Sequence, residues 1–337
     1  MTSILLVFTG GTIGSTTVNG TIDTSKEQGF KLLDLFKKNY SDSQQFQFKT
    51  IQPIQLLSEN LFSSIWEALI HAIEAENIYQ YDGIIVTHGT DTLAFTAAAL
   101  GLYFNAIKIP LLLVSSDYPL DNSKANGLNN FNCALQFVLQ RAEKGVFVPY
   151  KNPNKPTLVH IATRLSSCLQ LSGDFMSVQS KTYLQFQNNS FQQLNPLIQS
   201  NTNPTSLLPR FSKRILLIKP YPGLDYSTFQ LDQVDAVLHD LYHSGTACAT
   251  LDWGENHSLS AFIEKCNQQN ITIYMAPAIK TSEIYDSTRA LQKQGAKMIW
   301  NMSLESAYVK LLLGYGNFDN GTINQFLDAD IACEHIL

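Results

Sequence analysis

The sequence is poor in cysteine, and the placing of its five cysteines excludes two kinds of site. They are scattered, odd in number and never form a Cys-x-x-Cys pair, so neither a disulfide framework nor a zinc ligand set is expected. None stands in a turn that carries a motif, which argues against a catalytic cysteine. We expect reduced side chains that mostly pack in the interior (Cys133, Cys168, Cys248, Cys266 and Cys333).

Long apolar runs and basic clusters are missing as well. Runs such as Leu111–Val114 are far too short to cross a bilayer, so no membrane association is expected. The formal net charge is -5, and no group of basic residues could follow a phosphate backbone, so no nucleic-acid partner is expected. Met1–Ser3 leads into the apolar run Ile4–Phe8 without a signal-peptide pattern, from which we expect a cytoplasmic location.

The 337 residues are 45% hydrophobic, which is enough for a buried core, and the length favours two domains. Strand-like runs alternate with helical patterns, which predicts an α/β fold: a doubly wound, mostly parallel sheet in a larger N-terminal domain, and a smaller α/β C-terminal domain. The stretch Gln187–Pro209 is polar and has no period, so it is interpreted as the connection. We therefore expect a catalytic domain over residues 1–190, a linker over 191–211 and a second domain over 212–337.

The expected elements follow from apolar runs and from periodicity near 3.6 residues. The strands are expected at short apolar runs (Ile4–Phe8, Gly83–Val86, Pro110–Val114, Thr157–Ile161, Ile215–Ile218, Ala236–Leu238 and Ile271–Ala276). The helices are expected at periodic segments (Gln28–Asn39, Ser64–Glu76, Thr92–Phe104, Asn126–Lys144, Tyr226–Gln233, Ser258–Gln268, Ser282–Lys293 and Ser303–Gly314).

A glycine-rich turn, Thr9–Gly14, directly follows the first strand. Its glycines have neither the Gly-x-Gly-x-x-Gly spacing nor the Gly-Lys-Ser/Thr ending of a phosphate loop. It is either a tight turn in which glycines allow positive φ and Thr12 acts as a cap, or a turn that presents the Thr12 hydroxyl in a ligand crevice.

A second motif, Thr87–Thr92, directly follows the strand Gly83–Val86. Thr90 and Asp91 stand where a helix is expected to begin, so either residue could cap that helix. Capping is compatible with catalysis, because a helix N-terminus also stabilises an anion or an oxyanion. Two hydroxyls and an acid at two strand ends indicate nucleophilic chemistry on a small polar substrate.

The histidines give weaker signals. His88 could be a general base, but no carboxylate is placed behind it, and we favour a packed histidine that locks the turn. His239 and His243 are four residues apart without the His-Glu-x-x-His pattern or a third ligand, so a metal site is not expected.

Together, Thr9–Gly14 and His88–Thr92 resemble the paired motifs of the bacterial-type L-asparaginases. The lack of a signal-peptide pattern makes the chain more similar to the cytoplasmic, asparaginase I-like members. The resemblance runs almost the full length of the chain. It includes four further segments: Ser58–Asn60 is similar to the family's substrate loop, Ser123–Gly127 with Asn129 to its Ser-Asp-Gly-x-x-Asn region, Lys219–Gly223 to its Tyr-Pro-Gly turn, and His243–Thr246 to its Gly-Ser-Gly-Asn turn.

This resemblance implies hydrolysis of L-asparagine to L-aspartate and ammonia, with no metal or organic cofactor. It implies Thr12 as the nucleophile, Thr90 as a residue that helps to activate the attacking group or water, and Asp91 as the group that binds the substrate α-amino group. Substrate-binding residues are implied near these groups (Gly11, Ser58, Glu59 and Gly89). Because active sites in the family lie at subunit contacts, a homodimer or homotetramer is also implied.

Two positions depart from the family pattern. A lysine that pairs with the Thr-Asp of the second motif is expected after the strand Thr157–Ile161, but Ser172, Gly173 or Ser177 falls there, and Lys181 is the nearest candidate. The tyrosine of the family's flexible lid is matched by Thr21.

Three alternatives stay open from the sequence. The protein could be a glutaminase-asparaginase of relaxed specificity, because one methylene separates the two substrates. It could be a member that binds asparagine or aspartate but has weakened catalysis, which the unmatched lysine suggests. A nucleotide site at Gly10–Gly14 is the weakest alternative.

Overall fold

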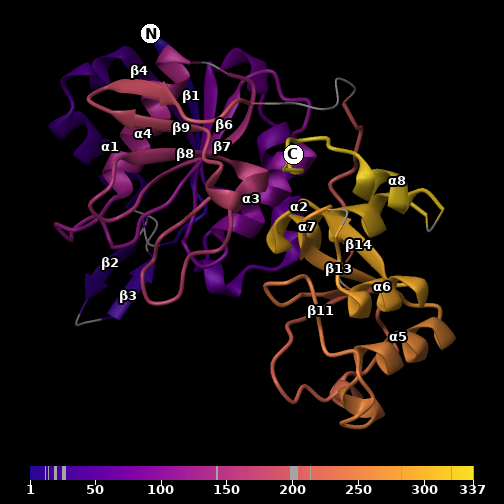
Figure 1. Ribbon diagram of the computed structural model, residues 1–337. Helices are drawn as coiled ribbons and strands as arrows, with labels where there is room; N and C mark the ends of the chain where they lie inside the picture. Colours follow the sequence, from indigo (N-terminus) through magenta and orange to yellow (C-terminus); the bar gives the residue numbers. More distant parts are fainter. Residues whose placement is uncertain are drawn as a thin grey trace. The chain divides into compact units, whose positions relative to one another are not determined.

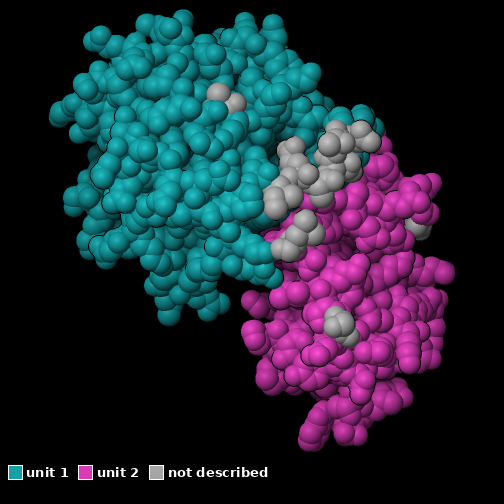
Figure 2. All heavy atoms as spheres, turned by 45° about the horizontal axis from the view of Figure 1, so that its top comes forward, with its two compact units in different colours: residues 1–209, 331–333 teal, residues 210–330, 334–337 magenta. Residues whose placement is uncertain are grey.

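The computed structural model describes residues 1–11, 13, 15–18, 21–24, 28–141, 143–197, 204–212, 214–281, 283–319 and 321–336. The chain divides into two compact units (Figure 2). Unit 1 comprises residues 1–209 and 331–333, and unit 2 comprises residues 210–330 and 334–337. Each unit is built around its own sheet (Figure 1).

Unit 1 contains an eight-stranded sheet in the order β10-β9-β8-β7-β6-β5-β1-β4. The strands from β4 to β7 pair in parallel, whereas β8, β9 and β10 extend the sheet in antiparallel fashion. Their bounds are as follows: β1 (Thr2–Val7), β4 (Phe46–Ile51), β5 (Gly83–Thr87), β6 (Pro110–Val114), β7 (Gly145–Lys151), β8 (Thr157–Ile161), β9 (Leu184–Gln187) and β10 (Ser190–Gln193). A separate hairpin joins β2 (Ser15–Val18) and β3 (Thr21–Thr24).

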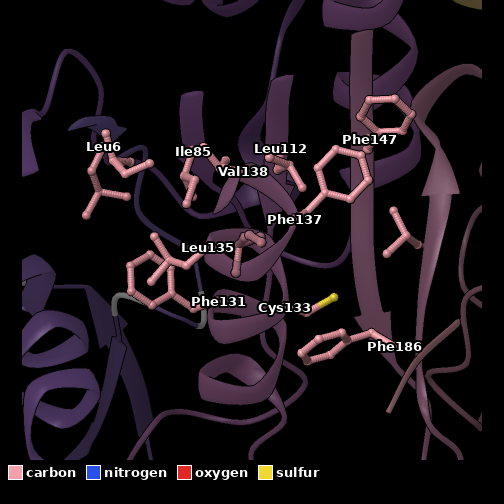
Figure 3. Packing of buried hydrophobic residues seen from close by; sticks show 14 of the residues in the cluster. Leu6, Ile85, Leu112, Phe131, Cys133, Leu135, Phe137, Val138, Phe147 and Phe186 are labelled. Atoms are coloured by element: carbon pink, nitrogen blue, oxygen red, sulfur yellow. The ribbon is translucent and has the colours of Figure 1, made fainter. Parts of the chain in front are cut away.

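Helices cover both faces of this sheet, which explains why its central strands are apolar throughout. Every residue of β5 and β6 is buried, as is typical of parallel strands enclosed on two sides. Side chains of α4 such as Phe131 and Phe137 lie against the strand residues Leu6 and Leu112 (Figure 3). The helices of unit 1 are α1 (Gln28–Asn39), α2 (Ser63–Glu74), α3 (Leu93–Tyr103) and α4 (Gly127–Gln140).

The strand order places a topological switch point between β1 and β5. The chain passes from β1 to β4 on one side, and then returns to β5 on the other side and continues outward through β6 and β7. Crossovers that leave in opposite directions open a crevice at the carboxyl ends of the two central strands, where open α/β sheets bind ligands. Both motifs singled out from the sequence follow these two strands.

Unit 2 contains a smaller sheet of parallel strands in the order β11-β12-β13-β14. Its strands are β11 (Ile215–Ile218), β12 (Ala236–His239), β13 (Thr272–Ala278) and β14 (Lys297–Trp300), and its helices are α5 (Leu259–Gln268), α6 (Asp286–Lys293), α7 (Leu304–Asn317) and α8 (Ile323–Asp328). The mixed α/β fold, with a large mostly parallel sheet and a second smaller one, confirms the fold class expected from the sequence. None of the helices in the described part of the chain has the length and apolarity that a membrane span requires.

The expected strand Thr157–Ile161 is present as β8, and it is antiparallel to its neighbour because β8 follows β7 through a short turn instead of a helical crossover. One expectation about a single element is wrong. The helix expected at Tyr226–Gln233 is only a 3-10 turn over Tyr226–Thr228. There Tyr226 is held in the core by stacking on Phe262, and Asp225 closes the turn by accepting a hydrogen bond from the Ser227 N–H. The strand β10 ends at Gln193, two residues after the expected start of the linker at 191.

One buried ion pair joins α7 to the C-terminal segment of unit 2. The Lys310 and Glu334 side chains are both 0% exposed, and Lys310 Nζ lies 2.5 Å from Glu334 Oε1. The same ammonium donates to the carbonyl oxygens of Leu327 at 3.2 Å and Ala329 at 2.5 Å. With three acceptors around it, the buried charge is well satisfied.

Candidate active site

Three segments of unit 1 meet beyond the carboxyl ends of β4, β1 and β5. The turn after β1 is tied to the segment after β4, because the Leu56 N–H donates to the Thr9 carbonyl at 3.0 Å and the Gly11 N–H donates to the Leu56 carbonyl at 3.1 Å. The same turn is tied to β5, because Thr9 Oγ1 donates to the Thr87 carbonyl at 2.6 Å. The two motifs, almost 80 residues apart in sequence, thus lie side by side at the switch point.

Two glycines allow this close approach. Gly11 has a φ of +76°, and a Cβ added to it would stand 2.4 Å from the backbone nitrogen of Gly89. A Cβ added to Gly89 would stand 2.3 Å from the Oγ of Ser58. Neither distance is tolerable for a side chain, so glycine is required at both positions. As a result, the backbone of Gly11 packs on Gly89, and Gly89 packs on the side chain of Ser58.

Ser58 connects the substrate loop to the second motif. Its hydroxyl donates to Asp91 Oδ2 at 3.0 Å and accepts from the Asp91 N–H at 3.3 Å. Its carbonyl accepts from Thr92 Oγ1 at 2.9 Å. Ser58 is buried and Asp91 is exposed. The buried hydroxyl of Ser58 therefore orients the Asp91 carboxylate, which remains accessible to a ligand.

Thr90 and Asp91 precede the first residue of α3, Leu93, whose N–H donates to the Thr90 carbonyl at 3.3 Å. Unpaired N–H groups and the helix dipole favour negative charge at this position. The half-buried hydroxyl of Thr90 and the carboxylate of Asp91 are therefore next to a place suited to an oxyanion or a substrate carboxylate.

His88 locks the turn, as favoured from the sequence. Its Nδ1 lies 2.8 Å from the Gly89 carbonyl, and its Nε2 lies 2.9 Å from Thr96 Oγ1. Trp66 Nε1 donates to the same Thr96 oxygen at 3.0 Å, so the Thr96 hydroxyl is free to donate to His88 Nε2. Burial lowers the pKa of His88 to about 4. The imidazole is neutral with both nitrogens occupied, and it supports the site without acting as a base.

The loop after β6 is also fixed by polar side chains. The Asn126 amide oxygen accepts from the Asp117 N–H at 3.0 Å, and the Gly127 N–H donates to Ser116 Oγ at 3.1 Å. Asn130 Nδ2 donates to the Ser115 carbonyl at 2.9 Å. Asn126 and Asn130 are both buried, and Asn130 directly follows Asn129, the residue that the resemblance pairs with the family motif.

Cys168, a residue for which the sequence predicts no catalytic role, interacts electrostatically with the Asp91 carboxylate. Burial raises the pKa of the Cys168 thiol, and the Asp91 carboxylate raises it further, so the side chain stays a neutral thiol. Cys168 stands in a hairpin closed by the Ser166 N–H donating to the Met176 carbonyl at 3.0 Å and the Leu169 N–H donating to the Asp174 carbonyl at 2.9 Å. Nothing in the sequence around Cys168 distinguishes this residue.

The remaining predicted residues fall at the edge of this arrangement. Glu59 is exposed within the 3-10 turn Ser58–Asn60. Lys181 is half-buried directly after the 3-10 turn Val178–Ser180, and its pairing with Thr90 stays a prediction. Thr12 and the side chain of Thr21 lie outside the described residues.

No group of three His, Cys, Asp or Glu side chains that could hold a metal ion occurs among the described residues. His239 is buried in unit 2 and its Nε2 is paired with the Tyr226 hydroxyl at 2.8 Å. It is therefore a packed residue of the core, and His243 stands in an exposed turn away from that bond.

A doubly wound α/β sheet with hydroxyl and carboxylate side chains at its switch point defines the class of the protein by its fold and by the place of its candidate ligand site. Residues 3–198 match the family model described as "Asparaginase, N-terminal", and the chain belongs to the asparaginase family. Its fold is that of an asparaginase-family amidohydrolase.

Similar proteins fall in two groups. A glutamyl-tRNA(Gln) amidotransferase subunit from Methanococcus maripaludis is 26% identical over 83% of this chain and 68% of its own length. The thermostable L-asparaginase from Thermococcus kodakarensis is 20% identical with a TM-score of 0.81, covering 99% of both chains. L-asparaginase I from Vibrio cholerae is 19% identical with a TM-score of 0.79, covering 100% of this chain and 99% of its own. At this identity the solved structures show the shared fold.

Replacing Ser58 by alanine is expected to lower kcat/KM for amide hydrolysis by between about 10- and 100-fold, because Asp91 loses a hydrogen bond to a charged oxygen. The measurement is steady-state kinetics of ammonia release. Ser63→Ala is the matched control, since it removes another buried hydroxyl, one that has no hydrogen-bond partner in the described structure. Equal kinetics for Ser58→Ala and the wild type would show that Asp91 does not depend on this contact.

Proposed function

We propose that the protein hydrolyses the side-chain amide of small ω-amide amino acids, accepting L-glutamine as well as L-asparagine. The observation that carries this proposal is the contact of Gly11 with Gly89 and of Ser58 with Asp91 at the switch point. It is supported by membership of the asparaginase family. Relaxed choice of substrate is favoured because the curated relatives are named for glutamyl-tRNA(Gln) amidotransfer, whereas the solved relatives are named L-asparaginases.

In this proposal the Thr12 hydroxyl attacks the amide carbon. A bond forms between Thr12 Oγ1 and that carbon, the hydroxyl proton passes to the amide nitrogen, the C–N bond breaks, and ammonia leaves. Water then cleaves the resulting ester and releases the acid. Backbone N–H groups near Thr12, other than that of Gly11, which donates to the Leu56 carbonyl, stabilise the oxyanion.

The remaining residues hold the substrate and tune the hydroxyls. Asp91 binds the α-amino group, which suits an exposed carboxylate oriented by Ser58. Ser58 and Glu59 hold the α-carboxylate and α-amino ends, and Thr90 helps to activate the attacking group or water. Hydrolysis of this kind needs no cofactor.

A coupled ammonia assay with both amino acids tests the proposal. We expect release from both, with kcat/KM values that differ by less than about 200-fold, because one methylene gives only modest discrimination. Release from L-asparagine alone would restrict the function to a plain asparaginase. Stabilisation against heat by L-aspartate without any release would instead identify a binding protein that has lost catalysis.

Replacing Lys181 by methionine is expected to lower kcat by about 10²- to 10⁴-fold if its amine assists Thr90, which is the range for acid–base assistance. Lys155→Met, an exposed lysine in a turn of the same unit, is the control and should leave kcat unchanged. An unaltered kcat for Lys181→Met would show that the Thr90 hydroxyl is activated without this side chain.

We further infer a cytoplasmic homodimer or homotetramer. Support for the location comes from a solved relative, a probable cytoplasmic L-asparaginase from Campylobacter jejuni, 20% identical with a TM-score of 0.74 and covering 97% of this chain and 99% of its own. The oligomeric state is the one that the resemblance to the family implies. Light scattering of the purified protein, which gives its mass in solution, measures the oligomeric state directly.

A further inference from the structure

Unit 2 contains a cavity of about 530 Å³ that the proposed amidohydrolase function does not use. It lies beyond the carboxyl ends of β11 and β12, between the loop that begins at Pro220 and the loop that runs to His257. Ligands of parallel sheets bind at this end of the strands, and the volume is that of a small-molecule site.

The walls of the cavity are mainly aromatic. Trp253 is 75% exposed, Tyr221 is 58% exposed and Tyr242 is 39% exposed, and all three line the same cavity. Large aromatic side chains in contact with water at one place mark a surface that gains free energy when a ligand covers it.

The floor of the cavity is fixed. Tyr226 is buried, stacks on Phe262 with ring centroids 4.8 Å apart, and its hydroxyl pairs with His239 Nε2 at 2.8 Å. Burial lowers the pKa of His239 to about 4, so this pair stays neutral. A packed, neutral floor supports the aromatic walls without adding charge.

Two hydrogen bonds hold the rims in place. His257 Nδ1 lies 2.9 Å from the Leu224 carbonyl, which joins the loop after β12 to the loop after β11. The Tyr242 N–H donates to the Thr246 carbonyl at 2.9 Å and closes the turn that carries Tyr242. The aromatic walls therefore come from two loops that are tied together before any ligand binds.

The charges around the cavity favour a cation. No lysine or arginine is among the described residues that line it. Asp225 follows Leu224 in the chain, and hydrogen bonds from the Ser227 hydroxyl and N–H lower the pKa of its carboxyl, so it is ionised at neutral pH. The nearby Lys219 ammonium interacts with the carboxylate of Asp240.

We propose that this cavity binds an organic ammonium ion with apolar substituents, held by the faces of Tyr221, Tyr242 and Trp253 and by the field of Asp225. Aromatic faces attract cations through their quadrupoles, and they do so most strongly for quaternary ammonium groups, which are weakly hydrated. None of the described residues that line the cavity is a lysine or an arginine that could pair with an anion.

The test uses the full-length protein and isothermal titration calorimetry with tetramethylammonium and with choline. Saturable binding of both ions at millimolar concentration is expected, and the neutral carbon isostere of choline, 3,3-dimethyl-1-butanol, is expected to bind at least about fivefold more weakly. Equal affinity for the isostere, or binding of glucose in place of the cations, would overturn the proposal in favour of a neutral ligand. Absence of saturation with either cation would overturn it outright.

Substitutions of the residues that line the cavity test where the cation binds. Trp253→Leu and Tyr221→Leu are expected to weaken binding about tenfold each, and Tyr285→Leu, an equally exposed tyrosine of unit 2 outside the lining, should bind as the wild type does. Asp225→Asn keeps the turn cap and removes the charge, so it should weaken the cation alone. Wild-type affinity in both wall variants, with the fold intact by thermal melting, would place the binding elsewhere and refute this assignment.

Discussion

Thr12→Ala is expected to lower kcat for amide hydrolysis by at least about 10³-fold, because it removes the oxygen that forms the bond to the amide carbon. The supporting geometry is the packing of the preceding residue, Gly11, against Gly89, one residue before Thr90. Ammonia release under saturating L-asparagine measures the effect. Since the substrate-binding groups remain, thermal stabilisation by L-aspartate should persist in this variant.

Two controls separate loss of chemistry from loss of folding. Thr12→Ser keeps a hydroxyl and should retain measurable turnover, whereas Thr281→Ala changes an exposed threonine of unit 2 and should have no effect on kcat. Turnover by Thr12→Ala near the wild-type rate would remove Thr12 from its proposed role and leave the Thr90 hydroxyl as the candidate.

Lys310→Met is expected to lower the free energy of unfolding by about 3–5 kcal/mol, because it leaves the Glu334 carboxylate buried without its counter-ion. The double variant Lys310→Met/Glu334→Leu should be less destabilised than the single one, because removal of both charges removes the unpaired one. Urea unfolding measures both values. The exposed Lys293→Met should change stability by less than about 0.5 kcal/mol, and a loss no larger than this for Lys310→Met would contradict the account.

The same pair predicts how stability depends on pH. Burial alone would raise the pKa of Glu334, but the Lys310 ammonium and the hydrogen bonds to the carboxylate lower it to about 2 from an ordinary value of 4.5. The ion pair therefore stabilises the fold above pH 4.5 and loses its effect as pH falls toward 2. Unfolding curves across this range should show a stability loss in the wild type that is much smaller in the double variant. An equal loss of stability in the wild type and in the double variant would show that other groups cause the acid sensitivity.

Much of the fold can be predicted from local patterns. Runs such as Gly83–Val86 and Pro110–Val114 are apolar throughout because both faces of their strands are covered, and this pattern is visible without a structure. The antiparallel pairing of β8 is not visible, because an apolar run has the same appearance in either direction and only the short connection from β7 decides it. The 3-10 turn at Tyr226 is likewise set by packing on Phe262, a contact between residues far apart in sequence.

The candidate site is predictable to the extent that it follows strand ends. Two motifs placed directly after β1 and β5 must meet if those strands are neighbours, and the structure pairs them with Ile4 opposite Gly83. The role of Ser58 as a donor to Asp91 needs the resemblance to a family as well, because nothing in its own sequence neighbourhood marks it. The place of Cys168 near Asp91 cannot be predicted, since a lone cysteine in a polar loop has no pattern that distinguishes it.

The central claim is that the hydroxyls of Thr12 and Thr90, together with Asp91, surround one amide carbon. A crystal structure with L-aspartate bound tests it most directly. We predict that the side-chain carboxyl carbon of the ligand lies within about 3.5 Å of both threonine oxygens, the separation of reacting groups, with the α-amino group on Asp91. Aspartate bound at another place, or Thr12 directed away from a ligand that contacts Thr90 and Asp91, would contradict it.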